Sequence, residues 1–262
     1  MDIFQIIVLG IVQGLTEFIP ISSSGHLVIG QNFFSGASDH VFLEFINIGT
    51  LLALIVFFRK KIVSIAQDVF VRKNYRLARN IIITAVPAGL VGFILADFIG
   101  SSAFFGSVVV VMVTLAVVGV IMVVLEKLPK ASPVASGEKL PAKRALVIGL
   151  AQVFALIPGV SRSGSTIIAG RLSGLPAAAA AEYSFLASLP IMIGVTLKIL
   201  ITDQEYLAAN MTALIVGNIA AFVAGVLAIG FLMQYLSKHS LALFGWYRIG
   251  LAVVLGIVLL IQ

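Results

Sequence analysis

Three ionisable residues stand out because they lie inside long apolar segments. Glu17 and His26 are the only ionisable side chains of residues 3–38, and Arg162 is the only one of residues 145–170. A charged side chain at the centre of a membrane costs roughly 2.5–3.5 kcal/mol, so the few that are retained there indicate function. Together these residues provide a carboxylate, an imidazole and a guanidinium, which transfer protons and bind phosphate.

Hydroxyl groups surround these residues in two Pro-, Gly- and Ser-rich breaks. The first reads FIPISSSGH over residues 18–26, and the second reads IPGVSRSG over residues 157–164. Serine caps helix N-termini well, and a helix N-terminus offers free N–H groups and a positive dipole end to a phosphate. Gln13 and Glu17, four residues apart, share one face of the helix before the first break. The combination predicts a phosphoryl-transfer site.

The composition specifies the elements that must position this site. The chain has 262 residues, of which 60% are hydrophobic and 11% are charged, and its mean hydropathy is +1.15. Soluble domains have about 45–50% apolar and about 25% charged residues, so a soluble enzyme and a disordered chain are excluded. Long unbroken apolar runs exclude a membrane β-barrel, and the absence of cysteine excludes disulfides and thiolate chemistry. We expect an all-α polytopic membrane protein.

Apolar runs long enough to cross a bilayer predict six full transmembrane helices. They lie near residues 41–58, 80–98, 106–125, 183–201, 211–236 and 244–261. Residues 3–31 and 144–175 contain the two breaks, and each flank is about half a span long. Each of these two segments predicts a re-entrant pair of half-helices, because broken backbone at membrane depth must be buried in protein or line a watery cavity.

The distribution of basic residues predicts the orientation. Most Lys and Arg residues lie between the first two spans, in the linker 127–143 and after the fifth span. By the positive-inside rule this side is cytoplasmic, so both termini are outside. The net charge of +6 is then explained by basic residues on the cytoplasmic side of the membrane, and it does not indicate a nucleic-acid partner. Near the start of the last span, Trp246 and Arg248 are expected to be interfacial anchors.

The two breaks belong to an internal repeat. Its halves cover approximately residues 1–126 and 144–262, joined by the cytoplasmic linker 127–143 in a single integral membrane domain. Three full spans per half is an odd number, so the halves must be inverted, as in many secondary transporters. The aligned pairs are Gly10 with Gly149, Gln13 with Gln152, residues 22–25 with residues 161–164 and, where an acidic residue opens a span, Glu44 with Glu182.

Two motifs, QGLTEFIPISSSGH over residues 13–26 and PGVSRSGST over residues 158–166, carry a family resemblance. The chain resembles undecaprenyl-diphosphate phosphatase, the bacitracin-resistance family of bacterial inner membranes, along nearly its whole length. The resemblance implies hydrolysis of undecaprenyl diphosphate to undecaprenyl phosphate and phosphate at the outer face. This reaction recycles the lipid carrier for cell-wall synthesis.

The resemblance also assigns residues. It implies the catalytic residues Glu17, Ser23, His26 and Arg162. It implies substrate binding by Gln13, Ser22, Ser24, Gly25, Ser161, Ser163 and Thr166. A divalent cation, Mg²⁺ or Ca²⁺, is expected to help, held by Glu17 and Gln13. The family often has glutamate where this chain has Gln13, which leaves Glu17 as the main carboxylate.

Several alternatives stay open at this point. Either Ser23 or His26 can be the nucleophile, with His26 or Glu17 taking the proton from Ser23. Simpler structural roles are a Glu17–Arg162 ion pair and helix-capping serines. The competing functional class is an inverted-repeat transporter or flippase of a lipid phosphate or another anion. The partners expected are undecaprenyl diphosphate and membrane lipids, and a homodimer is left open.

Overall fold

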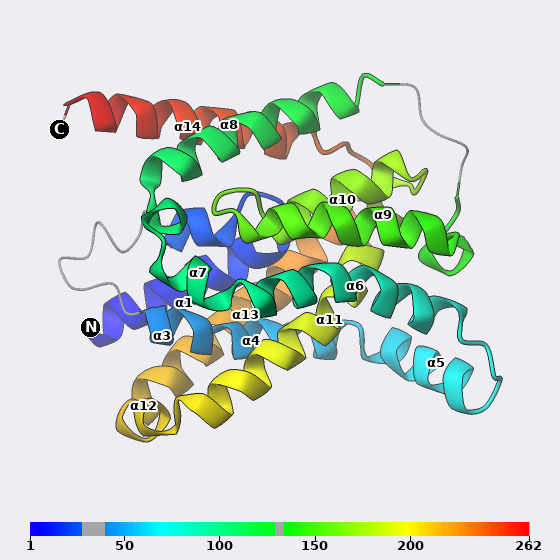
Figure 1. Ribbon diagram of the computed structural model, residues 1–262, viewed down its shortest axis with the longest axis horizontal. Coiled ribbons are helices and arrows are strands. Elements are labelled where there is room, and N and C mark those ends of the chain that lie inside the picture. The colour runs from blue at the N-terminus through cyan, green and yellow to red at the C-terminus, as the bar shows by residue number, and fades with distance from the viewer. Residues whose placement is uncertain (28–39, 129–133, 262) are drawn as a thin grey trace.

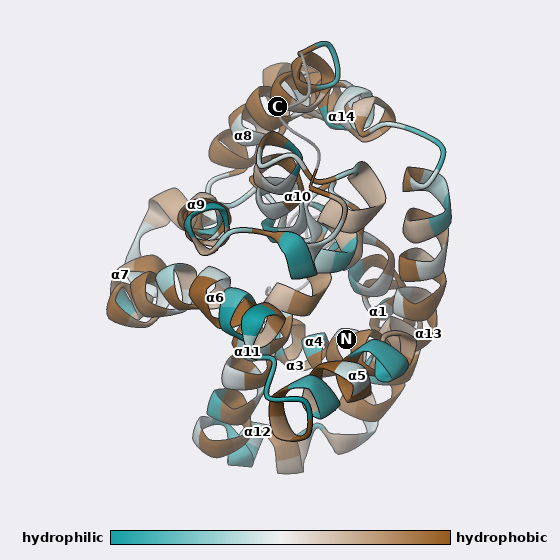
Figure 2. Cartoon of the chain, turned by 90° about the vertical axis from the view of Figure 1, so that its right-hand side faces the viewer, coloured by the Kyte–Doolittle hydropathy of each residue, from teal (hydrophilic) through white to brown (hydrophobic). Residues whose placement is uncertain are grey.

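The computed structural model describes residues 1–27, 40–128 and 134–261, and every regular element in these ranges is helical. Figure 1 shows long helices that run roughly side by side along the longest axis of the molecule. Figure 2 shows hydrophobic residues over most of these helices and hydrophilic residues concentrated on shorter stretches, α5 among them. An all-α polytopic membrane protein is therefore confirmed.

Five helices are long and apolar enough to cross a membrane. They are α6 (Arg76–Ile94), α8 (Val108–Leu125), α11 (Ala177–Thr202), α13 (Met211–Leu236) and α14 (Ala242–Ile261). A sixth candidate span is the pair formed by α3 (His40–Phe45) with α4 (Asn47–Phe57) and by α5 (Arg59–Phe70), which is bent by 71° and qualifies only when its two parts are counted together. These helices match the six expected spans, although the span predicted to begin at 183 starts at Ala177. Glu182 consequently lies inside α11 and does not open it.

The remaining helices are short. The half-helices beside the two breaks are the apolar α1 (Ile3–Phe18) and the more polar α9 (Ala142–Val153) and α10 (Arg162–Leu172). The connecting helices are α7 (Ala96–Ser101), α12 (Gln204–Ala209), η1 (Ala103–Gly106), η2 (Gly137–Lys139) and η3 (Phe154–Leu156). Both chain ends lie at the left of Figure 1, whereas α5 and the C-terminal end of α8 lie at the right. The basic α5 is therefore at the end of the bundle opposite to the termini.

Several helices of each half pack on helices of the other half. α1 packs on α13, and its counterpart α9 packs on α6. Likewise α4 packs on α13 while α11 packs on α6, and the counterparts α8 and α14 pack on each other. This exchange of partners is expected when two halves are related by a two-fold axis.

Glycines allow the half-helices to approach these partners closely. A Cβ built on Gly10 of α1 would lie 2.5 Å from the carbonyl oxygen of Gly217 on α13. A Cβ on Gly149 of α9 would lie 2.8 Å from the carbonyl oxygen of Thr84 on α6. Small residues permit this backbone contact between membrane helices, so the aligned pair Gly10 and Gly149 has a packing role.

Candidate active site

Both expected breaks are present, each flanked by short helices. α1 ends at Phe18, and helical structure resumes at Ser23 and continues to Leu27, the last described residue of this range. In the second half α9 ends at Val153 and is followed by η3, which ends at Leu156, and α10 begins at Arg162. The Pro- and Gly-containing stretches between them cannot continue a helix, which explains why each apolar segment turns at this point.

The two breaks have matching backbone geometry at their serine caps. Ser22 and Ser161 have φ angles of 75° and 76°, in the left-handed region that non-glycine residues rarely adopt. The Ser22 hydroxyl accepts a hydrogen bond of 3.3 Å from the N–H of Gly25, and the Ser161 hydroxyl accepts one of 3.1 Å from the N–H of Gly164. Backbone strain of this kind costs about 1–3 kcal/mol and is concentrated at functional sites.

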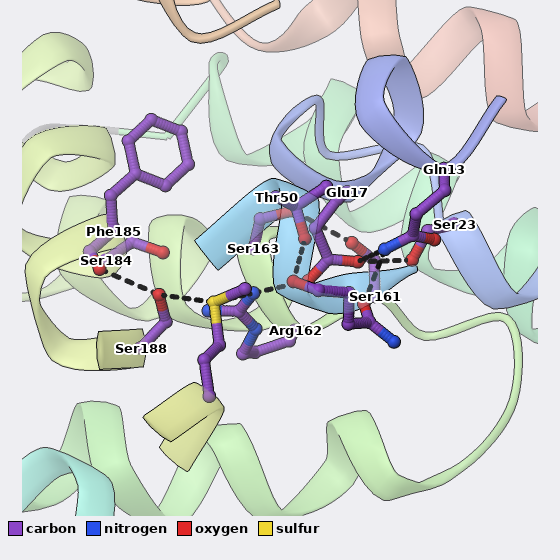
Figure 3. Close-up of polar contacts among 12 residues, drawn as sticks. Gln13, Glu17, Ser23, Thr50, Ser161, Arg162, Ser163, Ser184, Phe185 and Ser188 are labelled. Carbon is purple, nitrogen blue, oxygen red and sulfur yellow. Dashed lines mark hydrogen bonds and ion pairs between the residues drawn. The ribbon is translucent and has the colours of Figure 1, made fainter. Parts of the chain in front are cut away.

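Glu17 is the centre of a polar cluster that joins the two breaks. Its Oε2 accepts hydrogen bonds from Ser23 Oγ at 2.7 Å and from Gln13 Nε2 at 3.2 Å, and its Oε1 accepts one from Nη2 of Arg162. Figure 3 shows these side chains converging from separate segments. The Glu17 and Arg162 side chains are only 13% and 18% exposed. The carboxylate, the hydroxyl and the guanidinium predicted for phosphoryl transfer therefore lie in direct contact.

His26 lies outside this cluster of contacts. Its Nδ1 is 2.7 Å from the carbonyl oxygen of Ser22, and its Nε2 is 2.7 Å from the hydroxyl of Tyr247 on α14. The proton of Ser23 Oγ is directed to Glu17 in this arrangement. Of the two expected acceptors for that proton, the structure thus brings Glu17 to the hydroxyl and turns His26 toward α14.

The other candidate residues divide into two groups. Ser24 and Ser163 each approach the capping serine of their own break, at 3.2 Å from Ser22 Oγ and 3.1 Å from Ser161 Oγ. Thr166 instead faces α11, where its hydroxyl is 2.5 Å from that of Ser184. The serines line the breaks, whereas Thr166 fastens α10 to its neighbouring helix.

Arg248 is not an interfacial anchor, so that expectation is wrong. The side chain is fully buried. Its guanidinium donates to the carbonyl oxygen of Pro20 at 3.1 Å in the first break, and to those of Gly159 at 2.5 Å and Val160 at 3.1 Å in the second. Non-helical backbone leaves carbonyl groups without partners, and in the absence of water a buried guanidinium can satisfy several of them.

Three neighbours of the cluster were not anticipated. Asn47 Oδ1 accepts a hydrogen bond of 2.5 Å from Gln13 Nε2, and Met192 Sδ lies 3.5 Å from Nη2 of Arg162. Tyr247 holds His26. Asn47 could have been found as an amide near the start of an apolar span, and Tyr247 as the neighbour of Arg248. An apolar side chain such as Met192 in an apolar helix gives no signal.

The cation expected at Glu17 and Gln13 stays a prediction, because the two side chains are hydrogen-bonded to each other. The described residues hold no group of three acidic or histidine side chains that could ligate a metal ion. Gln13 turns its Nε2 donor, and not its oxygen, toward Glu17, and both carboxylate oxygens already accept hydrogen bonds. One carboxylate suits only a cation that shares most of its oxygen ligands with phosphate and water, as Mg²⁺ commonly does.

The fold and the site together define a polytopic α-helical membrane protein in which a buried cluster of Glu17, Ser23 and Arg162 joins two broken segments. The sequence is consistent with this class, since residues 6–254 match the family model described as bacitracin resistance protein BacA. The chain therefore belongs to the BacA family.

Relatives match over essentially their whole length. Undecaprenyl-diphosphatase 1 of Clostridioides difficile strain 630 is 40% identical over 268 residues, which cover 99% of this chain and 96% of the relative. Undecaprenyl-diphosphatase of Rubrobacter xylanophilus is 40% identical over 276 residues, covering 100% of both chains. Undecaprenyl-diphosphatase of Enterococcus faecalis is 35% identical and covers 99% of this chain and 96% of the relative.

Proposed function

We propose that this protein is an undecaprenyl-diphosphatase that releases phosphate from undecaprenyl diphosphate and yields undecaprenyl phosphate. The single observation that carries the proposal is the Glu17 carboxylate, which binds the hydroxyl of Ser23 and the guanidinium of Arg162 at the same time. The family match and the names of the relatives support the same activity. The product is the lipid carrier of cell-wall synthesis, and its recycling accounts for bacitracin resistance.

Substrate binding begins at Arg162 and at the two capped helix starts. The diphosphate enters the break from the side and its lipid tail stays among the apolar helices. Its terminal phosphate takes the guanidinium from Glu17, because a doubly charged phosphate attracts Arg162 more strongly than one carboxylate does. Free N–H groups at the start of α10 add further donors. Stabilising charge on the phosphoryl oxygens supplies most of what phosphoryl transfer requires.

Ser23 is the nucleophile favoured by this geometry. Its Oγ attacks the terminal phosphorus, the Oγ–P bond forms, and the P–O bond to the lipid phosphate breaks. The hydroxyl proton moves along the existing 2.7 Å hydrogen bond to Glu17, which has lost its guanidinium partner to the substrate and accepts the proton more readily. The step leaves undecaprenyl phosphate and phosphoserine at position 23.

Water completes the cycle. Its oxygen forms a bond to phosphorus, the P–Oγ bond breaks, and Glu17 returns its proton to Ser23 Oγ. His26 lies one turn after Ser23 on the same helix, so the two side chains share a face. We assign to Nε2 of His26 the acceptance of the proton from the attacking water, and His26 then passes this proton to the departing phosphate. A cation carried in by the diphosphate would be held by Glu17 and would add positive charge to the phosphate oxygens.

The orientation follows from the charge distribution. We propose that the end with α5 faces the cytoplasm of a bacterial inner membrane, and that both termini and the mouth of the site face outward. The chain has no cysteine, so single cysteines can be placed freely. Lys73→Cys at the basic end should resist a membrane-impermeant maleimide in intact cells, and Gln204→Cys at the other end should react.

Phosphate release from undecaprenyl diphosphate by the purified protein in detergent, with and without chelator, tests the function. Detergent leaves no compartments, so turnover there separates a hydrolase from a transporter. Substrate binding without phosphate release would overturn the proposal.

A further inference from the structure

The imidazole of His26 is held at both nitrogen atoms. Nδ1 lies 2.7 Å from the backbone carbonyl of Ser22, and Nε2 lies 2.7 Å from the hydroxyl of Tyr247. The two rings also stack, with centroids 5.7 Å apart and planes 10° apart. Tyr247 comes from α14, more than two hundred residues away in sequence, so this contact exists only in the folded protein.

The chemistry of the two partners fixes the tautomer of the neutral ring. A carbonyl oxygen only accepts hydrogen bonds, so Nδ1 must carry the proton. Nε2 of the neutral imidazole is then an acceptor, and the Tyr247 hydroxyl must be the donor. The Ser22 carbonyl, as the partner of Nδ1, therefore leaves Nε2 as the basic nitrogen of the ring.

We propose that Tyr247 is a positioning residue of the phosphatase. Its hydroxyl donates to Nε2 and its ring stacks on the imidazole, so together they fix the orientation of His26, whose Nδ1–H tautomer is set by the Ser22 carbonyl. This inference rests on the proposed function, in which His26 serves the second chemical step. During that step the water proton forms a bond to Nε2, and the Tyr247 hydroxyl releases Nε2 to receive it.

Arg248, the next residue, explains how α14 can hold Tyr247 at this place. Its guanidinium binds carbonyl groups of both breaks, so the helical turn that carries Tyr247 is tied to the loop that leads into Ser22. The Tyr247 side chain itself is 46% exposed. Replacing its hydroxyl therefore leaves a half-open position and not a buried cavity, which makes a conservative variant informative.

Tyr247→Phe tests the proposal because it keeps the stacked ring and removes the hydroxyl. We expect kcat to fall by roughly fivefold to tenfold, the value of one neutral hydrogen bond, with KM nearly unchanged. In the ¹⁵N spectrum of histidine-labelled protein, the Nε2 signal of His26 should lose the shift of a hydrogen-bonded acceptor. The chain has three histidines, so variants at His40 and His239 assign the signals.

The chain offers a matched control. Tyr235 also stacks on a histidine, His239, with centroids 4.5 Å apart, and this pair is joined only through the backbone carbonyl of Tyr235. Tyr235→Phe should therefore leave both kcat and the His26 spectrum unchanged. In a His26→Ala background, Tyr247→Phe should cause no further loss of residual activity.

The outcomes separate this inference from the proposed function. A Tyr247→Phe protein with an unchanged His26 spectrum, or with wild-type kcat, would overturn the positioning role. A further loss of activity in the His26→Ala background would overturn it as well. The spectrum is recorded without turnover, so it tests the His26–Tyr247 contact independently of activity. Absence of phosphate release by the wild-type protein would instead reject the proposed function.

Discussion

Ser23 and Arg162 occupy aligned positions of the two repeats, and their side chains bind the two oxygens of one carboxylate. Ser23 Oγ donates to Oε2 of Glu17, and Nη2 of Arg162 donates to Oε1. Each residue directly follows a capping serine with a positive φ angle. The two aligned loops thus place a hydroxyl and a guanidinium on the same carboxylate.

Removing the hydroxyl of Ser23 should abolish turnover. We expect Ser23→Ala to lower kcat by about a thousandfold or more, as removal of an enzyme nucleophile commonly does. Ser237→Ala is the control, because Ser237 is exposed at the end of α13 and its hydroxyl donates to the carbonyl of Gln234, and it should keep near-normal kcat. Phosphate release measures both. Comparable activity of the two variants would contradict the assignment of the nucleophile.

Arg162 cannot be replaced by another cation at this site. Arg162→Lys should lower kcat/KM by roughly a hundredfold, the effect of losing a donor to the transition state, because an ammonium lacks the planar fork that binds phosphate bidentately. The exposed Arg72, paired with Asp68 at 2.8 Å, provides the control variant Arg72→Lys. Full activity of Arg162→Lys would be inconsistent with direct phosphate contact.

The hydrogen bonds that Arg248 donates to carbonyl groups of both breaks form a clamp that should stabilise the fold. Arg248→Leu leaves buried carbonyls of both breaks without donors, which should destabilise the protein by at least about 2 kcal/mol. Thermal unfolding in detergent measures the loss. Arg72→Leu, which breaks only an exposed ion pair, should change stability by about 1 kcal/mol at most. Equal melting temperatures for the two variants would refute the clamp.

Close packing of α1 on α13 should make Gly10 sensitive to a single methyl group. Gly10→Ala places a Cβ 2.5 Å from the Gly217 carbonyl, so the helices must separate at a cost of about 1–3 kcal/mol. A Cβ at Gly89 of α6 meets nothing within 4 Å, so Gly89→Ala should be neutral or stabilising by up to about 1 kcal/mol. The same unfolding assay compares them, and an unaffected Gly10→Ala protein would show that the interface tolerates a wider spacing.

Much of the fold could be predicted from hydropathy alone, because each span had to be apolar and each break required proline, glycine and serine. The Glu17–Arg162 contact was also foreseeable, since few ionisable side chains occupy the membrane segments. The position of Arg248 was not. Arg248 is near the start of α14 in sequence, which suggests a place at the membrane–water interface. The tertiary packing of the two irregular loops instead decides where the Arg248 guanidinium lies. The positive φ angles of Ser22 and Ser161 likewise come from loop closure and have no signature in residue type.

The most direct test of the catalytic cluster is to identify the phosphorylated residue. Enzyme quenched during turnover of undecaprenyl diphosphate can be digested and mapped by mass spectrometry, with His26→Ala used to slow hydrolysis of the intermediate. The account predicts an acid-stable phosphoserine at Ser23 that is absent from Ser23→Ala. An acid-labile phosphohistidine at His26, or turnover without any phosphoenzyme, would contradict it.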